Sequence, residues 1–456
     1  MSKFNIKQTN KVINLAGGAA YKFDVKTELV HAVLTTFLDD KYYESGADRI
    51  ARLQDLISKN TPIFVSKLAV VARNEFNLRS VTTLLIGELA KTHRGDSLVK
   101  DTIIACAVRV DDLTELVAYL KGKLPKQVKR GIRNALFKFN RYQLAKYKNE
   151  GKGVSLVDVF NLVHPKVQFA SDEQKQAWGD LINGNLKSFD TWEVELAGSK
   201  DINERREKLS ELILSNKIGY MALLRNLNNA LEYGCNQEVI DHAVKRLSDK
   251  EEVLKSKQLP FRFMTAYKNV KGNILLSDAI SQAMDYAVGN VPALNGRTLI
   301  ALDCSGSMSG DPFETGSIFA ATLVKANPRA DFITYDTEIK EVSLSSRAPV
   351  VNIVNDLAKG RILGGTDTAL VFPYAQQKGG YDRIIIISDN ESWVSNAQIS
   401  RNQFAPNSHI YAIDIAGYGT HDLTGNKVTH LTSWSNNILE FISETEKDLV
   451  TYISNK

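Results

Sequence analysis

The first 290 residues carry apolar side chains that recur at steps of three and four, which is the spacing of one face of an α-helix. The clearest stretches are 61–76, 80–93, 97–110, 112–122, 126–147 and 211–234. Thr61 can cap the first of these helices, and Pro62 can occupy its first position. Consecutive amphipathic helices with short links predict stacked helical pairs. Because no strict repeat signature is present, the pattern favours divergent, HEAT-like pairs.

The pattern changes near residue 290, where runs rich in Ile, Val and Leu begin to alternate with helical stretches. Strands are predicted at 297–305, 330–336, 382–390 and 409–417, and helices at 313–326, 349–360 and 438–453. Such strands predict a doubly wound α/β domain with a parallel sheet buried on both faces. The segment 289–296 contains two Gly, two Asn and one Pro. We therefore expect an all-α domain at 1–290 and an α/β domain at 291–456.

Composition excludes several classes of protein. Hydrophobic residues make up 43% and charged residues 24% of the chain, as in ordinary folded proteins. No uncharged apolar run approaches the ~18 residues that cross a bilayer, and the N-terminal stretch lacks the apolar core of a secretory signal. Cys106, Cys235 and Cys304 are too few and too scattered for a disulfide framework or a zinc site. We expect a reducing, cytoplasmic location and no membrane partner.

The net charge of +5 combines two halves of opposite sign. Residues 1–290 hold 44 Lys and Arg against 34 Asp and Glu, a balance of +10. Residues 291–456 hold 13 against 18, a balance of −5. Opposite signs indicate different partners for the two halves. The basic half is the candidate for binding a polyanion such as RNA.

One interval concentrates that positive charge, because residues 116–149 contain ten basic and no acidic side chains. The candidate phosphate contacts in it are Lys126, Lys129, Arg130, Arg133, Lys138, Arg141 and Lys146. Lys126, Arg130 and Arg133 have helical spacing and share a face. The interleaved aromatic residues are Phe137, Phe139, Tyr142 and Tyr147. The mixture suits phosphate neutralisation with base stacking; the alternative is a solvated helix face whose aromatic residues belong to the core.

Three short motifs of the α/β half fall at strand ends or in loops: DCSGSM at 303–308, GGTD at 364–367 and SDNE at 388–391. Their oxygen donors are Asp303, Ser305, Ser307, Thr366 and Asp389. A hard divalent cation such as Mg²⁺ prefers about six oxygen ligands, some of them waters. We expect these residues to bind one, directly or through water. The alternative is that Asp303 and Ser305 only cap the next helix.

The D-x-S-x-S…T…D arrangement resembles the metal-ion-dependent adhesion site of von Willebrand factor A (vWA) domains. The resemblance implies a cation site that often keeps one coordination position open for an acidic group of a partner, although some members use the metal only structurally. No histidine lies near Ser305 in the sequence to serve as the base for a nucleophile. We therefore expect no enzymatic activity.

The strings AKYKNEGKGVSLVDVFNLVHPK (145–166), ALLRNLNNALEYG (222–234) and LPFRFMTAYKNV (259–270) resemble the TROVE module of Ro autoantigen-type RNA-binding proteins. The motifs DCSGSM, GGTDTA and SDNES are similar to the vWA domain that follows TROVE in those proteins. The likeness spans nearly the whole chain. It implies a ring of HEAT-like helical pairs closed by the vWA domain.

The resemblance also implies RNA partners. Ro proteins bind single-stranded ends of misfolded RNA in a basic central hole, and hold Y RNA or Y-like RNA on an outer surface that can tether an exoribonuclease. Lys146 and His164 match family positions that contact Y RNA, and a third basic contact falls near Asn149 or Glu150, where Lys152 can substitute. His164 can instead simply pack beside Pro165. We expect a monomeric ribonucleoprotein component of RNA quality control.

The role of two arginines and the function of the whole chain each leave an alternative open. Arg225 and Arg262 also lie in family-like strings, but in apolar contexts where a buried arginine needs a paired acid or a carbonyl group. The alternative function for the whole chain is a protein-interaction scaffold, in which the vWA site binds a carboxylate of an acidic partner and the helical array holds that protein.

Overall fold

The computed structural model describes residues 11–35, 45–148, 151–187, 201–270, 272–291, 293–345, 347–361, 363–394, 396–425, 427–432, 442 and 449–456. The chain forms two compact units, each assembled from segments distant in sequence. The helical unit consists of Asp24–Val194 and Leu449–Lys456, and the sheet unit of Met1–Phe23 and Glu195–Asp448. The predicted domain boundary between residues 290 and 291 lies inside the sheet unit and stays a prediction. That the helical pairs form a ring closed by the α/β domain also stays a prediction.

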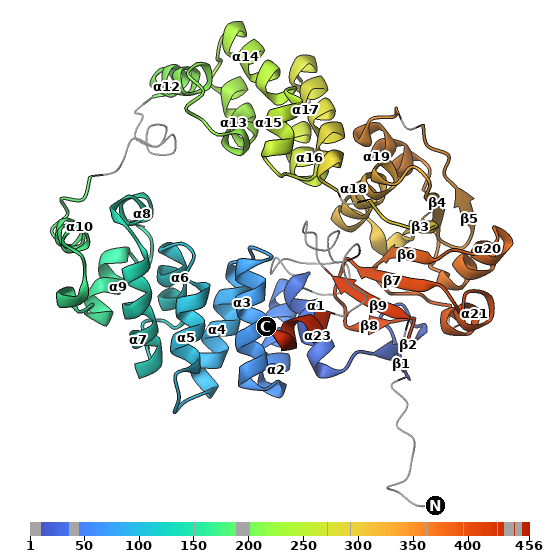
Figure 1. Cartoon of the computed structure of the whole chain (residues 1–456), viewed down its shortest axis with the longest axis horizontal. Helices are drawn as coiled ribbons and strands as arrows, with labels where there is room; N and C mark the ends of the chain where they lie inside the picture. The colour runs from blue at the N-terminus through green and yellow to red at the C-terminus, as the bar shows by residue number, and fades with distance from the viewer. Residues whose placement is uncertain are drawn as a thin grey trace, which may run out of the picture. The chain divides into compact units, whose positions relative to one another are not determined.

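The helical unit is a two-layered stack. Its helices are α1 (Val25–Leu34), α2 (Gly46–Lys59), α3 (Pro62–Asn74), α4 (Ser80–Thr92), α5 (Leu98–Cys106), α6 (Asp111–Tyr119), α7 (Lys126–Ala135), α8 (Arg141–Lys146), α9 (Leu156–Val163), α10 (Asp172–Ile182) and α23 (Leu449–Asn455). Helices α1, α3, α5 and α7 pack in succession as one layer, and α2, α4, α6 and α9 as the other. In Figure 1 they follow one another from blue to green. This arrangement confirms the stacked helical pairs predicted from the apolar spacing.

Local signals set several helix boundaries. The side chain of Thr61 accepts a hydrogen bond from the backbone of Phe64, and Pro62 opens α3, as predicted. The predicted single helix 126–147 is wrong in detail, since α7 is followed by a 3₁₀ turn, Leu136–Lys138, and then by α8. The physical reason is a reciprocal cap between Asn140 and Gln143 that starts a new helix.

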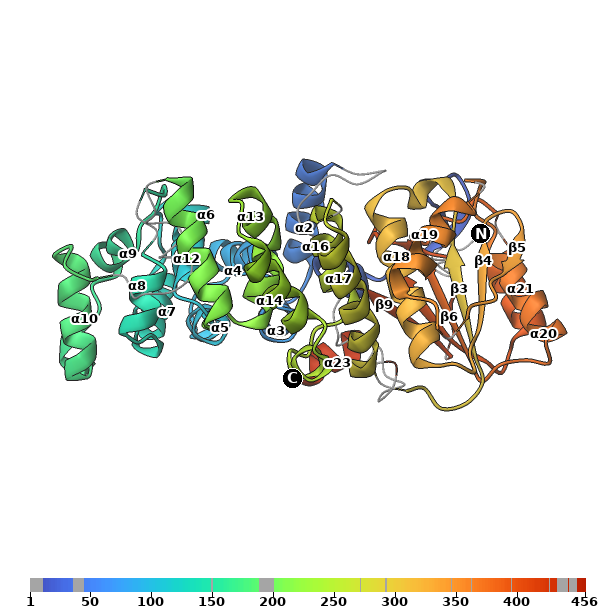
Figure 2. The same ribbon diagram turned by 90° about the horizontal axis from the view of Figure 1, so that it is seen from above.

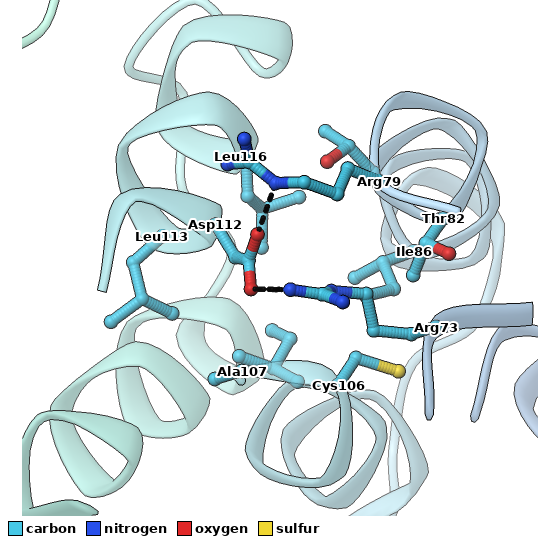
Figure 3. Close-up of a pocket in the computed structure, with 11 residues that line it drawn as sticks. Arg73, Arg79, Thr82, Ile86, Cys106, Ala107, Asp112, Leu113 and Leu116 are labelled. Carbon is cyan, nitrogen blue, oxygen red and sulfur yellow. Dashed lines mark hydrogen bonds and ion pairs between the residues drawn. The ribbon is translucent and has the colours of Figure 1, made fainter. Parts of the chain in front are cut away.

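A charge network ties α3, α4 and α6 together. Asp112 on α6 accepts hydrogen bonds from Arg73 at 2.8 Å and from Arg79 at 3.0 Å, and Figure 3 shows it between the two guanidinium groups. Arg79 also reaches Asp111, which pairs with Arg109 at 2.7 Å. Arg73, Arg79 and Asp112 line a cavity of about 20 Å³, otherwise walled mainly by apolar side chains. Because Arg73 is buried, its paired carboxylate is a structural requirement.

The sheet unit contains further helices and two sheets. The helices before the large sheet are α12 (Ile202–Leu214), α13 (Tyr220–Glu232), α14 (Gln237–Leu247), α15 (Lys250–Lys255), α16 (Pro260–Asn269) and α17 (Ile274–Ala287), followed by a 3₁₀ turn, Val288–Asn290. Helices α16 and α17 pack on α18 (Asp311–Ala326) and α19 (Val350–Lys359). Asp285 on α17 accepts hydrogen bonds from Lys325 at 2.7 Å and from the backbone of Val350 at 3.0 Å, so the contact is specific.

The large sheet is doubly wound, as predicted. Its strands are β3 (Thr298–Asp303), β4 (Asp331–Tyr335), β5 (Ile339–Glu341), β6 (Arg383–Ser388), β7 (His409–Asp414) and β9 (Val428–Thr432), in the order β5-β4-β3-β6-β7-β9. All neighbours are parallel except the edge pair β4 and β5. Figures 1 and 2 show α18 and α19 on one face, with α20 (Val371–Gln377) and α21 (Ala397–Phe404) on the other.

A second sheet forms from short segments in which the sequence pattern predicted no strand. Strands β1 (Lys11–Ile13) and β2 (Ala19–Lys22) make an antiparallel hairpin, and β2 pairs with β8 (Thr420–His421). The hairpin therefore lies on the α/β part of the sheet unit (Figure 1). Short strands of this kind are stable only when a longer structure supports them, which a pattern of single residues does not reveal. Among the described helices, none is long and apolar enough to cross a membrane.

Candidate metal centre and nucleic-acid surface

The first metal motif stands where the sheet topology favours a ligand site. Chain connections run outward in opposite directions from β3 and β6, so their carboxyl ends form the switch point of the sheet. Asp303 ends β3 and is fully buried. Its Oδ1 accepts a hydrogen bond from the backbone of Ser305 at 2.9 Å, and its Oδ2 accepts one from the Ser388 hydroxyl at 2.7 Å. The Ser305 and Ser307 hydroxyl oxygens lie 3.3 Å apart.

The glycine-rich loop lies against the first motif. The Gly306 backbone N–H donates to the carbonyl oxygen of Gly364 at 3.1 Å. Gly365 packs on the indole of Trp393, whose Nε1 would lie 2.4 Å from an added Cβ, so a larger residue at this position would displace the indole. Thr366 is buried, and its carbonyl oxygen accepts a hydrogen bond from the Ser392 hydroxyl at 3.0 Å. The second and third motifs are thereby joined.

The third motif leaves a buried carboxylate oxygen without a partner. Asp389 is buried and its Oδ1 accepts the backbone N–H of Glu391 at 3.2 Å. In the part of the chain that the structure describes, its Oδ2 has no hydrogen-bond partner. A buried carboxylate oxygen in this state costs free energy unless a proton or a cation satisfies it.

Electrostatics at this edge of the sheet favours a cation. Burial raises the pKa of Asp303, and burial together with the charge of Asp303 raises the pKa of Asp389 to about 8. The described residues contain no group of three or more His, Cys, Asp and Glu arranged as metal ligands. The candidate set instead combines two carboxylates with hydroxyls, donors that suit a hard cation holding several waters. The residues present therefore fit such an ion.

Arg361 adds a positive charge beside the first motif. Its guanidinium donates hydrogen bonds to the carbonyl oxygens of Cys304 at 3.2 Å and Ser305 at 2.5 Å, and it stacks on Phe313. These contacts hold the backbone of the DCSGSM loop and lower the net negative charge near Asp303. Sequence reasoning missed Arg361, because it lies outside the three motifs.

The predicted RNA contacts divide into two groups. Lys126 and Arg130 on α7 are exposed and Lys129 is half-buried, while Val128, Ile132 and Ala135 on the same helix are buried. Within the described ranges, these three basic side chains have no carboxylate partner. Helix α7 thus presents an unneutralised positive face to solvent.

Three other predicted contacts have protein partners. Arg133 donates to the carbonyl oxygen of Val163, Lys138 to that of Ile104 at 2.8 Å, and Arg141 pairs with Asp180 at 2.6 Å. The shared face of Lys126, Arg130 and Arg133 is therefore less uniform than the spacing predicts. Contact of these three side chains with RNA stays a prediction.

Some of the interleaved aromatic residues are packed in the core, and others are exposed. Phe139 is buried and Phe137 packs on the buried Trp178 with ring centroids 5.2 Å apart, so these two belong to the core. Tyr142 is 40% exposed. The Lys146 ammonium lies 5.8 Å from the Tyr142 ring, a contact that brings a cation and an aromatic face together.

His164 and its neighbours lie at the end of α9. His164 is exposed and has a left-handed backbone with φ of 48°, which terminates the helix. Lys166 lies over the ring of Phe169, which is 68% exposed. Sequence reasoning missed Phe169, although the string VHPK precedes it. Lys152 is exposed, whereas Asn149 and Glu150 lie outside the described residues.

The expected acid partners of Arg225 and Arg262 are absent among the described residues. Both side chains are exposed, on α13 and α16, two helices that pack together. Protein atoms around the Arg262 guanidinium and the positive charge of Arg225 lower the pKa of Arg262. The two arginines form an uncompensated pair of like charges.

Two regions of the chain match models of known domain families. Residues 184–275 match the model of the TROVE domain, and residues 297–402 match that of the Ro60 vWA domain. The chain is 27% identical over 267 residues to RNA-binding protein RO60 of Caenorhabditis elegans, covering 51% of this chain and 41% of that protein. It is 26% identical over 215 residues to RNA-binding protein RO60 of Deinococcus radiodurans, covering 41% and 40%. The matches thus span about two fifths of these relatives.

A solved structure shows the same fold. The crystal structure of the Deinococcus radiodurans RO (RSR) protein aligns with a TM-score of 0.67 and 17% identity, covering 93% of this chain and 100% of that one. The helical array followed by an α/β domain is therefore confirmed. Together the matches confirm the resemblance to the Ro family, because a region that matches the TROVE domain is followed by one that matches the Ro60 vWA domain.

Proposed function

We propose that this protein is a Ro-type RNA-binding protein that takes part in RNA quality control in the cytoplasm. It binds small noncoding, Y-like RNA and the single-stranded ends of misfolded noncoding RNA. The observation that carries the proposal is the unneutralised face of α7, formed by Lys126, Lys129 and Arg130 within an interval of 34 residues without acid. The relatives named as RNA-binding proteins support the same partner.

The chemistry of this face suits a phosphate chain. Lysine and arginine side chains that are not paired with carboxylates release counterions from RNA when they bind its phosphates. Tyr142, which is partly exposed beside Lys146, can stack on a base. Neither interaction reads the edge of a base, so we expect weak sequence selectivity.

A salt titration tests the proposal. Fluorescence anisotropy with an RNA duplex bearing a 3′ single-stranded overhang should give an affinity that falls between about 50 and 200 mM salt. A blunt duplex serves as the matched RNA and should bind more weakly. Binding of the overhang RNA that is insensitive to salt, or absent, would contradict the proposal.

We also propose that Asp303, Ser305, Ser307, Thr366 and Asp389 hold a divalent cation, Mg²⁺. The partnerless Oδ2 of the buried Asp389 supports this assignment. When bound, the ion neutralises the two carboxylates and offers a coordination position to an acidic group. Hydrogen bonds from Ser305 and Ser388 hold the Asp303 carboxylate in place.

That site supports a second candidate function, a protein-interaction scaffold for an acidic partner. The two functions differ in what copurifies with the protein. An absorbance ratio characteristic of nucleic acid favours the first, and a stoichiometric acidic protein without nucleic acid favours the second. In the leading proposal the protein is monomeric and not an enzyme, and an exoribonuclease is tethered to it through RNA.

A further inference from the structure

The N-terminal hairpin is fastened to the loop that carries Asp389. The backbone N–H groups of Leu15 and Ala16 donate to Oε2 of Glu391 at 2.6 and 3.3 Å. The other carboxylate oxygen of Glu391 accepts the Thr420 hydroxyl at 2.6 Å. Glu391 is only 1% exposed. Because a buried carboxylate requires donors, the hairpin supplies two of the three that satisfy it.

Asn14 and Gly18 make a second attachment to the same loop. The Asn14 side-chain amide donates to the carbonyl oxygen of Ser392 at 2.6 Å, and its Oδ1 accepts the Gly18 backbone N–H at 2.7 Å. Gly18 lies so close to the loop that an added Cβ would be 2.0 Å from the Ser392 carbonyl oxygen. The turn between β1 and β2 thus fits directly on residues 391–393.

The loop transmits these contacts to the candidate metal donors. The Glu391 backbone N–H donates to Oδ1 of Asp389 at 3.2 Å. Ser392 is held by Asn14 through its carbonyl oxygen and donates its hydroxyl to the Thr366 carbonyl oxygen at 3.0 Å. The Trp393 backbone N–H donates to the same oxygen at 3.3 Å. One residue therefore separates the hairpin from each of two donors, Asp389 and Thr366.

The far end of the hairpin is anchored independently. Strand β2 pairs with β8 in the register Tyr21 to His421. Phe23 is buried and stacks on His421 with ring centroids 4.2 Å apart. The hairpin is therefore held both at its turn and along β2.

We propose that Glu391 is a positioning residue for the cation site, and that residues 11–22 act through it to hold Asp389 and Thr366 in ligating geometry. The inference rests on the divalent-cation site proposed above. It assigns to the N-terminal segment a role in metal affinity, although that segment contributes no ligand. Loss of a residue that holds a metal ligand by a hydrogen bond typically weakens metal affinity by about 10- to 100-fold.

Binding of Mn²⁺ to the full chain, followed by electron paramagnetic resonance, tests the inference. We expect E391A to weaken Mn²⁺ affinity by about tenfold or more. E391Q can keep both backbone hydrogen bonds on its oxygen and donate its amide to Thr420, so it should stay within about threefold of the wild type. E341A is the control. Glu341 lies on the edge strand β5 and pairs with Lys378, not with a residue of the hairpin.

The outcomes separate the two proposals. No Mn²⁺ binding by the wild type would overturn the cation site itself. Binding by the wild type with unchanged affinity in a folded E391A would overturn the positioning role and leave the cation site standing. If E391A does not fold, N14A decides: weaker Mn²⁺ binding at unchanged stability in EDTA supports the role, and unchanged binding overturns it.

Discussion

Arg133 donates hydrogen bonds from Nε and Nη2 to the backbone carbonyl oxygen of Val163, over 2.9 and 2.7 Å. Val163 is the last residue of α9, where carbonyl groups lack partners within the helix. Arg133 therefore joins α7 to the end of α9, while Lys126 and Arg130 on the same helix face solvent. Arg133 thus makes a structural contact, whereas Lys126 and Arg130 remain available to a ligand.

We predict that R133A lowers the free energy of unfolding of the chain by about 1.5–3 kcal/mol, because a charged hydrogen bond to a backbone oxygen is lost. K126A should change it by less than about 0.5 kcal/mol, as is usual for an exposed residue. Urea denaturation followed by circular dichroism measures both. Equal effects of the two substitutions would show that the Val163 contact does not stabilise the fold.

RNA affinity, unlike stability, should depend on the exposed cations of α7. Replacing Lys126 and Arg130 together with alanine removes two phosphate contacts, so the slope of log affinity against log salt should fall by about 1.4 on single-stranded RNA. Salt titrations of anisotropy measure the slope. K245A/K255A, which removes two exposed charges from α14 and α15, is the control. A wild-type slope in K126A/R130A would place RNA elsewhere.

Arg225 and Arg262 should together bind an anion, and their mutual repulsion should lower the stability of the folded protein. We predict that R225A/R262A weakens RNA binding by threefold or more without lowering the melting temperature, since two like charges no longer repel each other. R225K/R262K should retain most of the affinity. Loss of stability in the alanine variant would instead indicate that the arginines have a structural role.

Asp303 should matter for metal and not for RNA. Mg²⁺ at about 100 times its dissociation constant should stabilise the wild type by about 2.7 kcal/mol and leave D303A unaffected. RNA affinity should be the same in both, because the charged face of α7 lies in the other compact unit. Thermal melts with Mg²⁺ or EDTA and an anisotropy titration test the two statements. Loss of RNA binding by a folded D303A would refute the separation.

Without metal, the stability of the protein should depend on pH. The pKa of Asp389 is raised to about 8 by burial and by the charge of Asp303. A carboxyl group whose pKa is raised on folding stabilises the fold at low pH, and this stabilisation is lost as pH rises through the folded-state value. In EDTA the melting temperature should therefore fall from about pH 4 to about pH 8, between the ordinary aspartate value and the folded-state value, and D389N should reduce the slope. A rising melting temperature would contradict the assigned shift.

Local sequence patterns predict much of the fold. Thr61 and Pro62 mark the start of α3 because capping and proline geometry depend on adjacent residues only. The end of β3 places Asp303 at the carboxyl edge of a parallel sheet for a similarly local reason, since a run of buried apolar residues stops there. The candidate metal donors were therefore found from sequence, and the α7 cations Lys126 and Arg130 with them.

Other features depend on partners that are distant in sequence. The pairing of Arg133 with Val163 and of Arg141 with Asp180 spans tens of residues, and nothing near either arginine indicates it. The attachment of Leu15 to Glu391 spans 376 residues, and β2 pairs with β8, a strand that is similarly remote in sequence. By itself the sequence determined the helical array, the order of the two domain types and the motifs, because these follow from periodicity and nearest neighbours. Only the tertiary structure decided which charges are neutralised and which loops are held, because hydrogen bonds and ion pairs form between groups that folding alone brings within reach.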